Sequence, residues 1–137
     1  MTAKEYLSQA RYLDVCINTK IHQVSVLNDL ATKCTSTISG MPRNPSPSQS
    51  PMADTVAKII DLEEEINRDI DRLVDLKREL TAVIKAVEDP QYQTLLEMRY
   101  ICLRSWEDIA ADFNTSPNNI FKMHRRALRL VTVPENG

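Results

Sequence analysis

The chain has 137 residues, a net charge of −2 and 42% apolar residues. This length allows one domain, or two small ones, with a real apolar core. The only glycines are Gly40 and Gly137, and the apolar residues recur in long periodic runs, so we predict an all-α fold. No apolar run approaches the ~20 residues that span a bilayer, and the N-terminus lacks the apolar core of a signal peptide. We therefore expect a cytoplasmic protein with no membrane contact.

The three cysteines give no sign of a metal site or a disulfide framework. Cys16, Cys34 and Cys102 lie far apart, with no CxxC pair and no histidine at ligand spacing. We interpret them as reduced and mostly buried thiols of an intracellular protein.

Residues 1–88 contain two seven-residue apolar repeats, separated by a segment rich in proline and serine. Repeats of this kind form the seam of a coiled coil. The separating segment, residues 39–53, is predicted to be a disordered loop. Because the two flanking helices are of similar length, we expect a long antiparallel helical hairpin. A parallel coiled coil between two chains is the alternative. The seam positions are Ala3, Tyr6, Ala10, Leu13, Ile17, Val24, Leu27, Ala31, Cys34 and Ile38, then Ile59, Leu62, Ile66, Leu73, Leu76, Leu80, Val83 and Val87.

Two polar residues, Lys20 and Asp69, interrupt this apolar seam. If the hairpin folds about residues 39–53, the two side chains come within about one helical turn of each other. One hypothesis is that they pair and fix the register of the two helices. The alternative is that each long side chain reaches solvent separately.

Residues 89–133 are predicted to form a second module, made of short helices with capping residues at their starts. Asp89 precedes Pro90 and is suited to cap a helix that extends to about Leu103. Ser105 begins a capping box, with an aspartate in place of the usual glutamate or glutamine. Asn114 stands where a tight turn needs a left-handed residue. Ser116 then caps the last helix, with proline at its first position. The predicted inner face of the helix after Ser105 comprises Trp106, Ile109, Ala110 and Phe113.

The last helix, residues 117–130, separates apolar from basic side chains. Wound at 3.6 residues per turn, it gathers an apolar face on one side, comprising Ile120, Met123, Ala127, Leu130 and Val131. No acid occurs between Asn114 and Val133. The other side is the candidate DNA-binding site, for which we name Ser116, Asn118, Asn119, Lys122, Arg125, Arg126 and Arg129. A solvated surface and a protein-docking face are the alternatives. Two neighbours are assigned other roles. Phe121 is expected to pack on the helix from Pro90 to Leu103 or on the hairpin, with contact to a thymine methyl group or docking on RNA polymerase as the alternatives. His124 is expected to meet phosphate or solvent.

The segment from about residue 92 to 131 resembles region 4 of the sigma-70 family of bacterial sigma factors. The residues that carry the resemblance are Trp106, Glu107, Asp108, Ile109, Ala110, Ser116, Ile120, Arg126, Ala127 and Leu128. The whole layout is similar to small phage and mobile-element proteins such as the ArpU-type late transcriptional regulators. The resemblance implies a helix-turn-helix over residues 89–133. The chain departs from region 4 at Asn114, where glycine is usual, and it lacks sigma region 2.

We therefore predict a sequence-specific DNA-binding regulator of transcription from a phage or mobile element, with double-stranded DNA as its partner. A homodimer through the hairpin is expected to present two reading heads. Two alternatives stay open: an adaptor that docks on RNA polymerase, as sigma region 4 does, and a DNA-packaging recognition subunit of a phage. The sequence offers no phosphate loop and no paired carboxylates, so we expect neither an enzyme nor a cofactor or metal.

Overall fold

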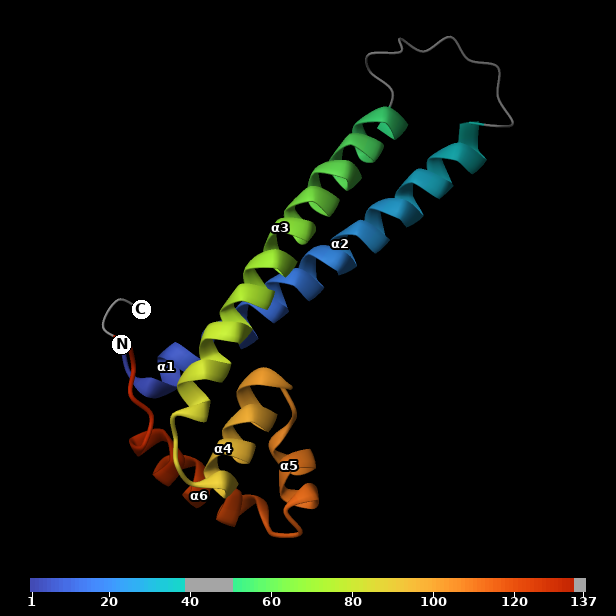
Figure 1. The fold of residues 1–137 in the computed structure, drawn as a ribbon. Helices are drawn as coiled ribbons and strands as arrows, with labels where there is room; N and C mark the ends of the chain where they lie inside the picture. Colours follow the sequence, from blue (N-terminus) through green and yellow to red (C-terminus); the bar gives the residue numbers. More distant parts are fainter. Residues whose placement is uncertain (39–50, 135–137) are drawn as a thin grey trace. The chain divides into compact units, whose positions relative to one another are not determined.

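The computed structural model describes residues 1–38 and 51–134, and within these ranges the chain forms helices and no strands (Figure 1). The predicted all-α class is confirmed. In chain order the elements are α1 (Ala3–Leu7), α2 (Gln9–Ile38), α3 (Pro51–Lys85), α4 (Pro90–Leu96), the π-helix η2 (Glu97–Ile101), α5 (Trp106–Asp112) and α6 (Pro117–Arg129). Among the described residues, no helix is both long and apolar enough to cross a bilayer.

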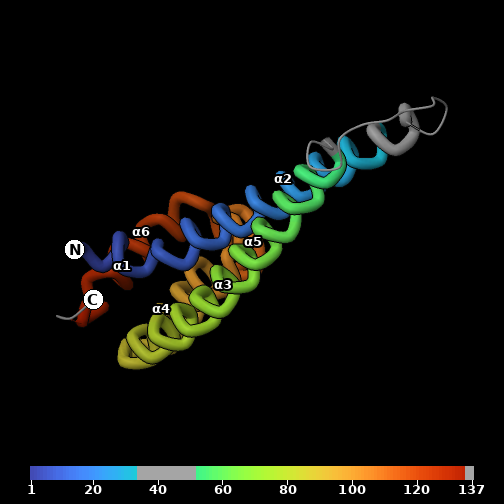
Figure 2. The backbone as a smooth tube through the Cα atoms, turned by 90° about the horizontal axis from the view of Figure 1, so that it is seen from above, coloured from blue at the N-terminus to red at the C-terminus, as the bar shows by residue number. Residues whose placement is uncertain are grey.

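The chain divides into two compact units. The first unit comprises Met1–Asp14 and Arg72–Gly137, and the second comprises Val15–Asp71. The first unit therefore combines an N-terminal segment with the whole C-terminal half. Within it, α6 contacts α1, α4 and α5, and Figure 2 shows α1 beside α6 from above.

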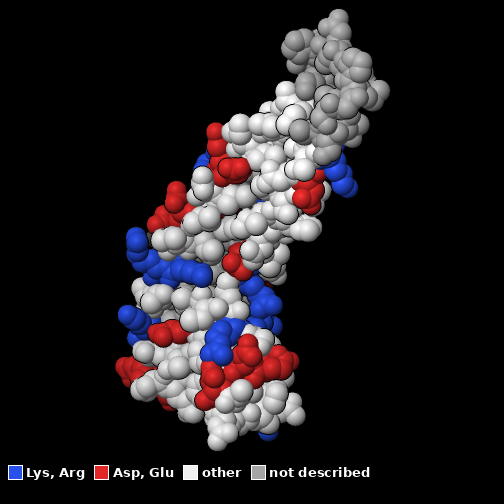
Figure 3. All heavy atoms as spheres, turned by 90° about the vertical axis from the view of Figure 1, so that its right-hand side faces the viewer, with Lys and Arg blue, Asp and Glu red and all other residues white. Residues whose placement is uncertain are grey.

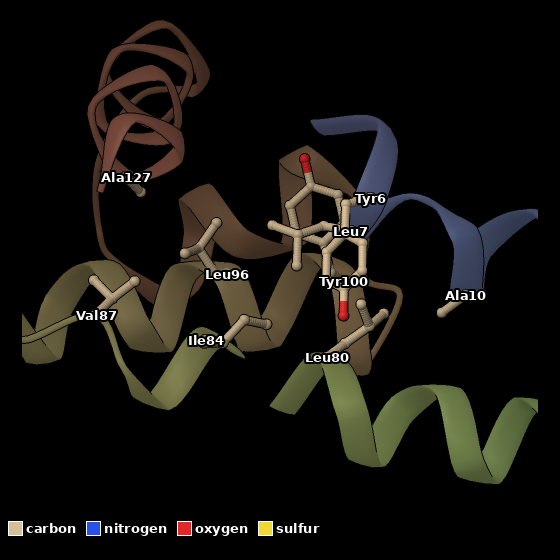
Figure 4. Close-up of a cluster of buried hydrophobic side chains, with 9 residues drawn as sticks. All are labelled: Tyr6, Leu7, Ala10, Leu80, Ile84, Val87, Leu96, Tyr100 and Ala127. Carbon is tan, nitrogen blue, oxygen red and sulfur yellow. The ribbon is translucent and has the colours of Figure 1, made fainter. Parts of the chain in front are cut away.

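The main core of the first unit draws on segments that lie far apart in the sequence (Figure 4). Leu7 from α1, Ile84 from α3 and Leu96 from α4 are completely buried there. Burying a side chain of this size contributes about 1.5–3 kcal/mol each. This core therefore fixes α1 and the end of α3 against α4, η2 and α6. Its full membership is Tyr6, Leu7, Ala10, Leu80, Ile84, Val87, Leu96, Tyr100 and Ala127.

In the second unit, Lys20 of α2 pairs with Asp69 of α3. The ammonium Nζ donates to Asp69 Oδ2 at 2.7 Å and lies 3.5 Å from Glu65 Oε2. The hydrogen bond to Asp69 raises the pKa of Lys20. Of the two readings of these seam positions, pairing is confirmed. The two helices run side by side through this unit in both ribbon views (Figures 1 and 2).

Several predicted element boundaries are wrong. The helical run expected from residue 3 is interrupted at Ser8, between α1 and α2. Helix α3 begins at Pro51, so residues 51–53 are helical rather than part of a loop, since proline is tolerated in the first turn of a helix. The rest of the predicted loop, residues 39–50, lies outside the described residues.

The helix expected from Pro90 to about Leu103 is also shorter and less regular than predicted. Asp89 caps it as expected, because its carboxylate accepts from the backbone N–H groups of Gln91 and Tyr92. Regular α-helix ends at Leu96 and a π-helical turn follows. Leu103 then takes a left-handed backbone conformation, with φ of 56°. Such a turn depends on tertiary packing, so apolar periodicity does not reveal it.

The cysteine prediction is wrong in part. Cys16 and Cys102 are free thiols, but both are exposed rather than buried. The side chain of Cys34 lies outside the part of the chain that the structure describes.

Candidate nucleic-acid interface

Helix α5 is a short element held by its cap and its inner face. The Ser105 hydroxyl accepts from the Asp108 backbone N–H, as the capping pattern predicts. Ile109 and Ala110 are buried in a second apolar cluster together with residues of α4 and α6. The predicted inner face is therefore confirmed at these two positions, and α5 is fixed against its neighbours.

The turn after α5 depends on Asn114. Its backbone φ of 55° is left-handed, as predicted, and asparagine adopts that region more readily than most residues. The backbone N–H of Thr115 donates to the Ala110 carbonyl at 3.0 Å and closes the turn. This tight closure lets α6 start only a few residues after α5 ends.

Helix α6 begins at its predicted cap and buries its predicted apolar side. The Ser116 hydroxyl accepts from the Asn119 backbone N–H at 3.2 Å. Ile120, Met123 and Ala127 are buried. Leu130 was expected to join them but is half exposed. The reason is that the helix ends at Arg129 and Leu130 is its C-cap.

The opposite side of α6 is exposed and basic. We call it the basic stripe; it comprises Asn118, Lys122, Arg125, Arg126 and Arg129, all exposed. The four cations line a surface hollow of 310 Å³. The structure thus gathers these five predicted site residues on one free face. A hollow lined by cations alone attracts anions such as phosphate.

The other two predicted site residues have local roles. The Ser116 hydroxyl is used as the helix cap. The Asn119 side-chain amide donates to Thr115 Oγ1 at 3.0 Å. Asn118, the other predicted amide, is exposed on the basic stripe.

His124 does not meet solvent, which corrects the prediction. Its side chain is buried and shares a 2.6 Å hydrogen bond with the hydroxyl of Tyr100. Burial, together with the nearby cations Lys4 and Arg99, lowers the pKa of His124 to about 4. Burial also raises the pKa of Tyr100 to about 12. At neutral pH both groups are uncharged, so they join α6 to η2 without adding charge.

The π-helical turn positions a cation over the single tryptophan. The Arg99 guanidinium carbon lies 4.2 Å from the ring centroid of Trp106, a cation–π distance. Burial lowers the pKa of Arg99, and the positive charge of the nearby Arg11 lowers it as well. Arg99 Nη1 also donates to the Arg104 carbonyl at 2.9 Å. These contacts fasten the start of α5 to η2.

Phe121 packs on Trp106 of α5, a partner that the sequence analysis did not name. The two rings meet edge to face at 5.3 Å between centroids. Phe121 is still 40% exposed, so one side of the ring faces outward beside the basic stripe.

Sequence reasoning missed Lys4. This side chain comes from α1, yet it lines a second hollow with Trp106, Phe121, Lys122 and other residues of α6. No periodic pattern in the sequence links residue 4 to residue 122. The two side chains line the same hollow because α1 packs on α6.

The basic stripe is a local feature of an acidic protein. The face drawn in Figure 3 carries basic and acidic side chains in small neighbouring groups, so neither sign dominates there. The basic stripe differs from this mixed surface because none of its residues is acidic, and a surface of that composition attracts anions.

Comparisons with known proteins identify a family but no activity. No curated protein and no solved structure matches the chain. A family model described as "Protein of unknown function (DUF1492)" matches residues 48–132, which is more than half of the sequence. The protein therefore belongs to the DUF1492 family.

Proposed function

We propose that this protein is a sequence-specific DNA-binding regulator of a phage or mobile element. In this proposal α5 and α6 form a sigma region 4-like helix-turn-helix, and α6 enters the major groove. The observation that carries it is the division of α6: Ile120, Met123 and Ala127 are buried while the basic stripe is exposed. A helix held by its apolar side keeps its cations available to phosphates.

The cations and the asparagine of the basic stripe have different roles in DNA binding. Lys122, Arg125, Arg126 and Arg129 neutralise backbone phosphates and provide affinity that does not depend on sequence. Asn118, at the start of the helix, is the side chain nearest to base edges, since asparagine pairs in a bidentate manner with adenine. Asn119 contributes less, because its amide is held by Thr115.

The test measures the binding of the full chain to a pool of random duplexes as salt is raised. With four phosphate contacts, the affinity should fall about 100-fold between about 50 and 200 mM salt. Arg125→Ala should weaken binding to all sequences and reduce the salt slope by about 0.9. The matched control is Arg78→Ala, which removes an exposed arginine of α3 and should leave the slope unchanged.

Sequence preference is tested separately by selecting bound duplexes from the pool. Asn118→Ala should alter the selected sequence while changing the salt slope little, because it removes no charge. Equal, salt-independent binding by the wild type and the Arg125 variant would contradict the proposal.

We further propose that α2 and α3 form an antiparallel hairpin that pairs with a second copy. Supporting it, apolar side chains stay exposed on both helices of the second unit, among them Val15, Ile21, Ile60 and Ile70. A four-helix bundle would cover them and bring two reading heads together. Light scattering should give a dimer, and Ile21→Glu with Ile60→Glu should give a monomer. A monomeric wild type would contradict this.

The runner-up function is an adaptor that docks on RNA polymerase. The observation that favours it is the outward-facing side of Phe121, an aromatic side chain that is 40% exposed. Exposed apolar side chains within a polar surface are typical of protein contacts. Binding to purified polymerase that Phe121→Ser abolishes, with no binding to random duplexes, would favour the adaptor over the DNA-binding regulator.

A further inference from the structure

A hollow of 540 Å³ opens beside the basic stripe, between α1, α5 and α6. Three cations line it: Lys4 from α1, and Lys122 and Arg125 from α6. The remaining wall is largely aromatic, formed by Trp106 and Phe121 with the imidazole of His124. The hollow thus combines convergent positive charge with flat apolar surfaces.

The lining of this hollow is strongly positive at neutral pH. None of its lining residues is an aspartate or a glutamate. His124 is uncharged there, since its pKa is lowered to about 4, so the charge comes from the three long side chains alone. Aromatic walls keep some water away and thereby strengthen the attraction of an anion to those cations. The chemistry favours a compact anion with an apolar neighbour.

Lys4 is held in place by its own short helix. Thr2 and Glu5 form a reciprocal capping box at the start of α1. Tyr6 and Leu7, two and three residues after Lys4, are buried in the main core. The influence of Lys4 on the pKa of His124 is a second sign that its charge lies close to α6. The backbone that carries Lys4 is therefore fixed by its helix and by the core, and the side chain lines the hollow from there.

We infer that this hollow seats a phosphate of the DNA backbone, with Lys4 as a ligand supplied from outside α5 and α6. The inference rests on the proposed function and extends it to a residue of the N-terminal segment. The hollow lies along the half of α6 that contains Asn118, Lys122 and Arg125. A strand that borders the groove entered by this half of the helix places a phosphodiester and its sugar there. The phosphate meets the cations, and the sugar packs on Phe121 and Trp106.

The test uses the full chain and two readouts. The first is the salt slope of binding to random duplexes. Lys4→Ala should reduce the slope by about 0.9, as loss of one phosphate contact does, and Lys4→Arg should restore it. The matched control is Lys85→Ala, which removes an exposed lysine of α3 that does not line the hollow.

The second readout is the fluorescence of Trp106, which is the only tryptophan in the chain. Because this side chain lines the hollow, its emission should change when duplex DNA binds, and the change should be smaller in Lys4→Ala. Inorganic phosphate serves as the competing probe. It should leave the emission unchanged at concentrations far above those at which DNA saturates the protein.

The outcomes separate this inference from the proposed function. Arg126→Ala could lower the salt slope while Lys4→Ala leaves it unchanged and DNA leaves the emission of Trp106 unchanged. In that case the protein binds DNA, but the hollow does not bind a phosphate of the DNA backbone. If no duplex binds at low salt, both proposals fail. If inorganic phosphate alone changes the emission and displaces DNA, the site takes a free anion and the backbone assignment is overturned.

Discussion

The two compact units of this protein bury their apolar side chains to different extents. In the first unit Leu95, Ile109 and Ile120 are completely buried, because several helices surround each of them. In the second unit Ile66 retains 9% exposure and Ile60 retains 51%. A helix with one neighbour covers only a narrow line of its surface, whereas a helix with several neighbours covers a whole face. The first unit therefore has a core of its own, and the second leaves apolar surface uncovered.

Ile109→Ala should have the largest effect on stability, because it empties a fully buried position in the first unit. We expect a loss of about 2–4 kcal/mol in the free energy of unfolding, measured by urea denaturation. Ile60→Ala removes the same atoms from a position of the second unit that is exposed in the single chain, and at concentrations too low for the chain to dimerise it should cost less than about 0.5 kcal/mol. Equal losses of unfolding free energy for the two variants would contradict the claim that the two units bury their apolar side chains to different extents.

Acid should weaken the first unit through His124. Its pKa in the folded protein, about 4, lies below the value of 6.5 for a free histidine. The unfolded chain therefore binds more protons between these values, and stability falls as the pH drops from about 6.5 towards 4. With partial solvent screening, the loss should be about 2 kcal/mol. His124→Gln should show a shallower pH dependence of unfolding; an identical dependence would show that the imidazole is not buried in neutral form.

The cap of α6 should make a smaller contribution to the first unit. Ser116→Ala removes the hydroxyl that accepts from the Asn119 N–H and should cost about 1 kcal/mol. Ser116→Gly should cost only a few tenths, because glycine is itself tolerated at this position. Thermal melting of the two variants measures the difference. No difference between either variant and the wild type would mean that the helix start is held by packing alone.

The ion pair of the second unit should have the smallest effect, because Lys20 remains in contact with solvent. Lys20→Leu and Asp69→Leu should each lower the melting temperature. The double variant should lose less than the sum of the two, since the partners touch at 2.7 Å. Strict additivity would show that the contact does not contribute to the stability of the second unit.

The features predicted most accurately from the sequence are those that depend only on neighbouring residues. Asp89, Ser105 and Ser116 cap helices through hydrogen bonds to residues two or three positions away, so a short window contains all the information. Asn114 is of the same kind, since only its own backbone angles matter. The pairing of Lys20 with Asp69 could be predicted because each of them interrupts one of the two apolar repeats, at positions that a hairpin brings close together.

Contacts between distant segments that share no apolar repeat could not be predicted. The burial of His124 depends on Tyr100, in a π-helical turn that periodicity does not reveal. Lys4 reaches the basic stripe only because α1 packs on α6. Consequently the cations and Asn118 of the candidate site were found from sequence, whereas the hollow beside them was not.

The most direct test of the account is a nuclear magnetic resonance titration of the full chain with a random duplex. If the basic stripe is the surface that meets DNA, the changes in backbone amide shifts should concentrate on Asn118–Arg129 and around Lys4, while residues 15–71 change little. Shifts confined to residues 15–71, or no shifts at low salt, would contradict that claim.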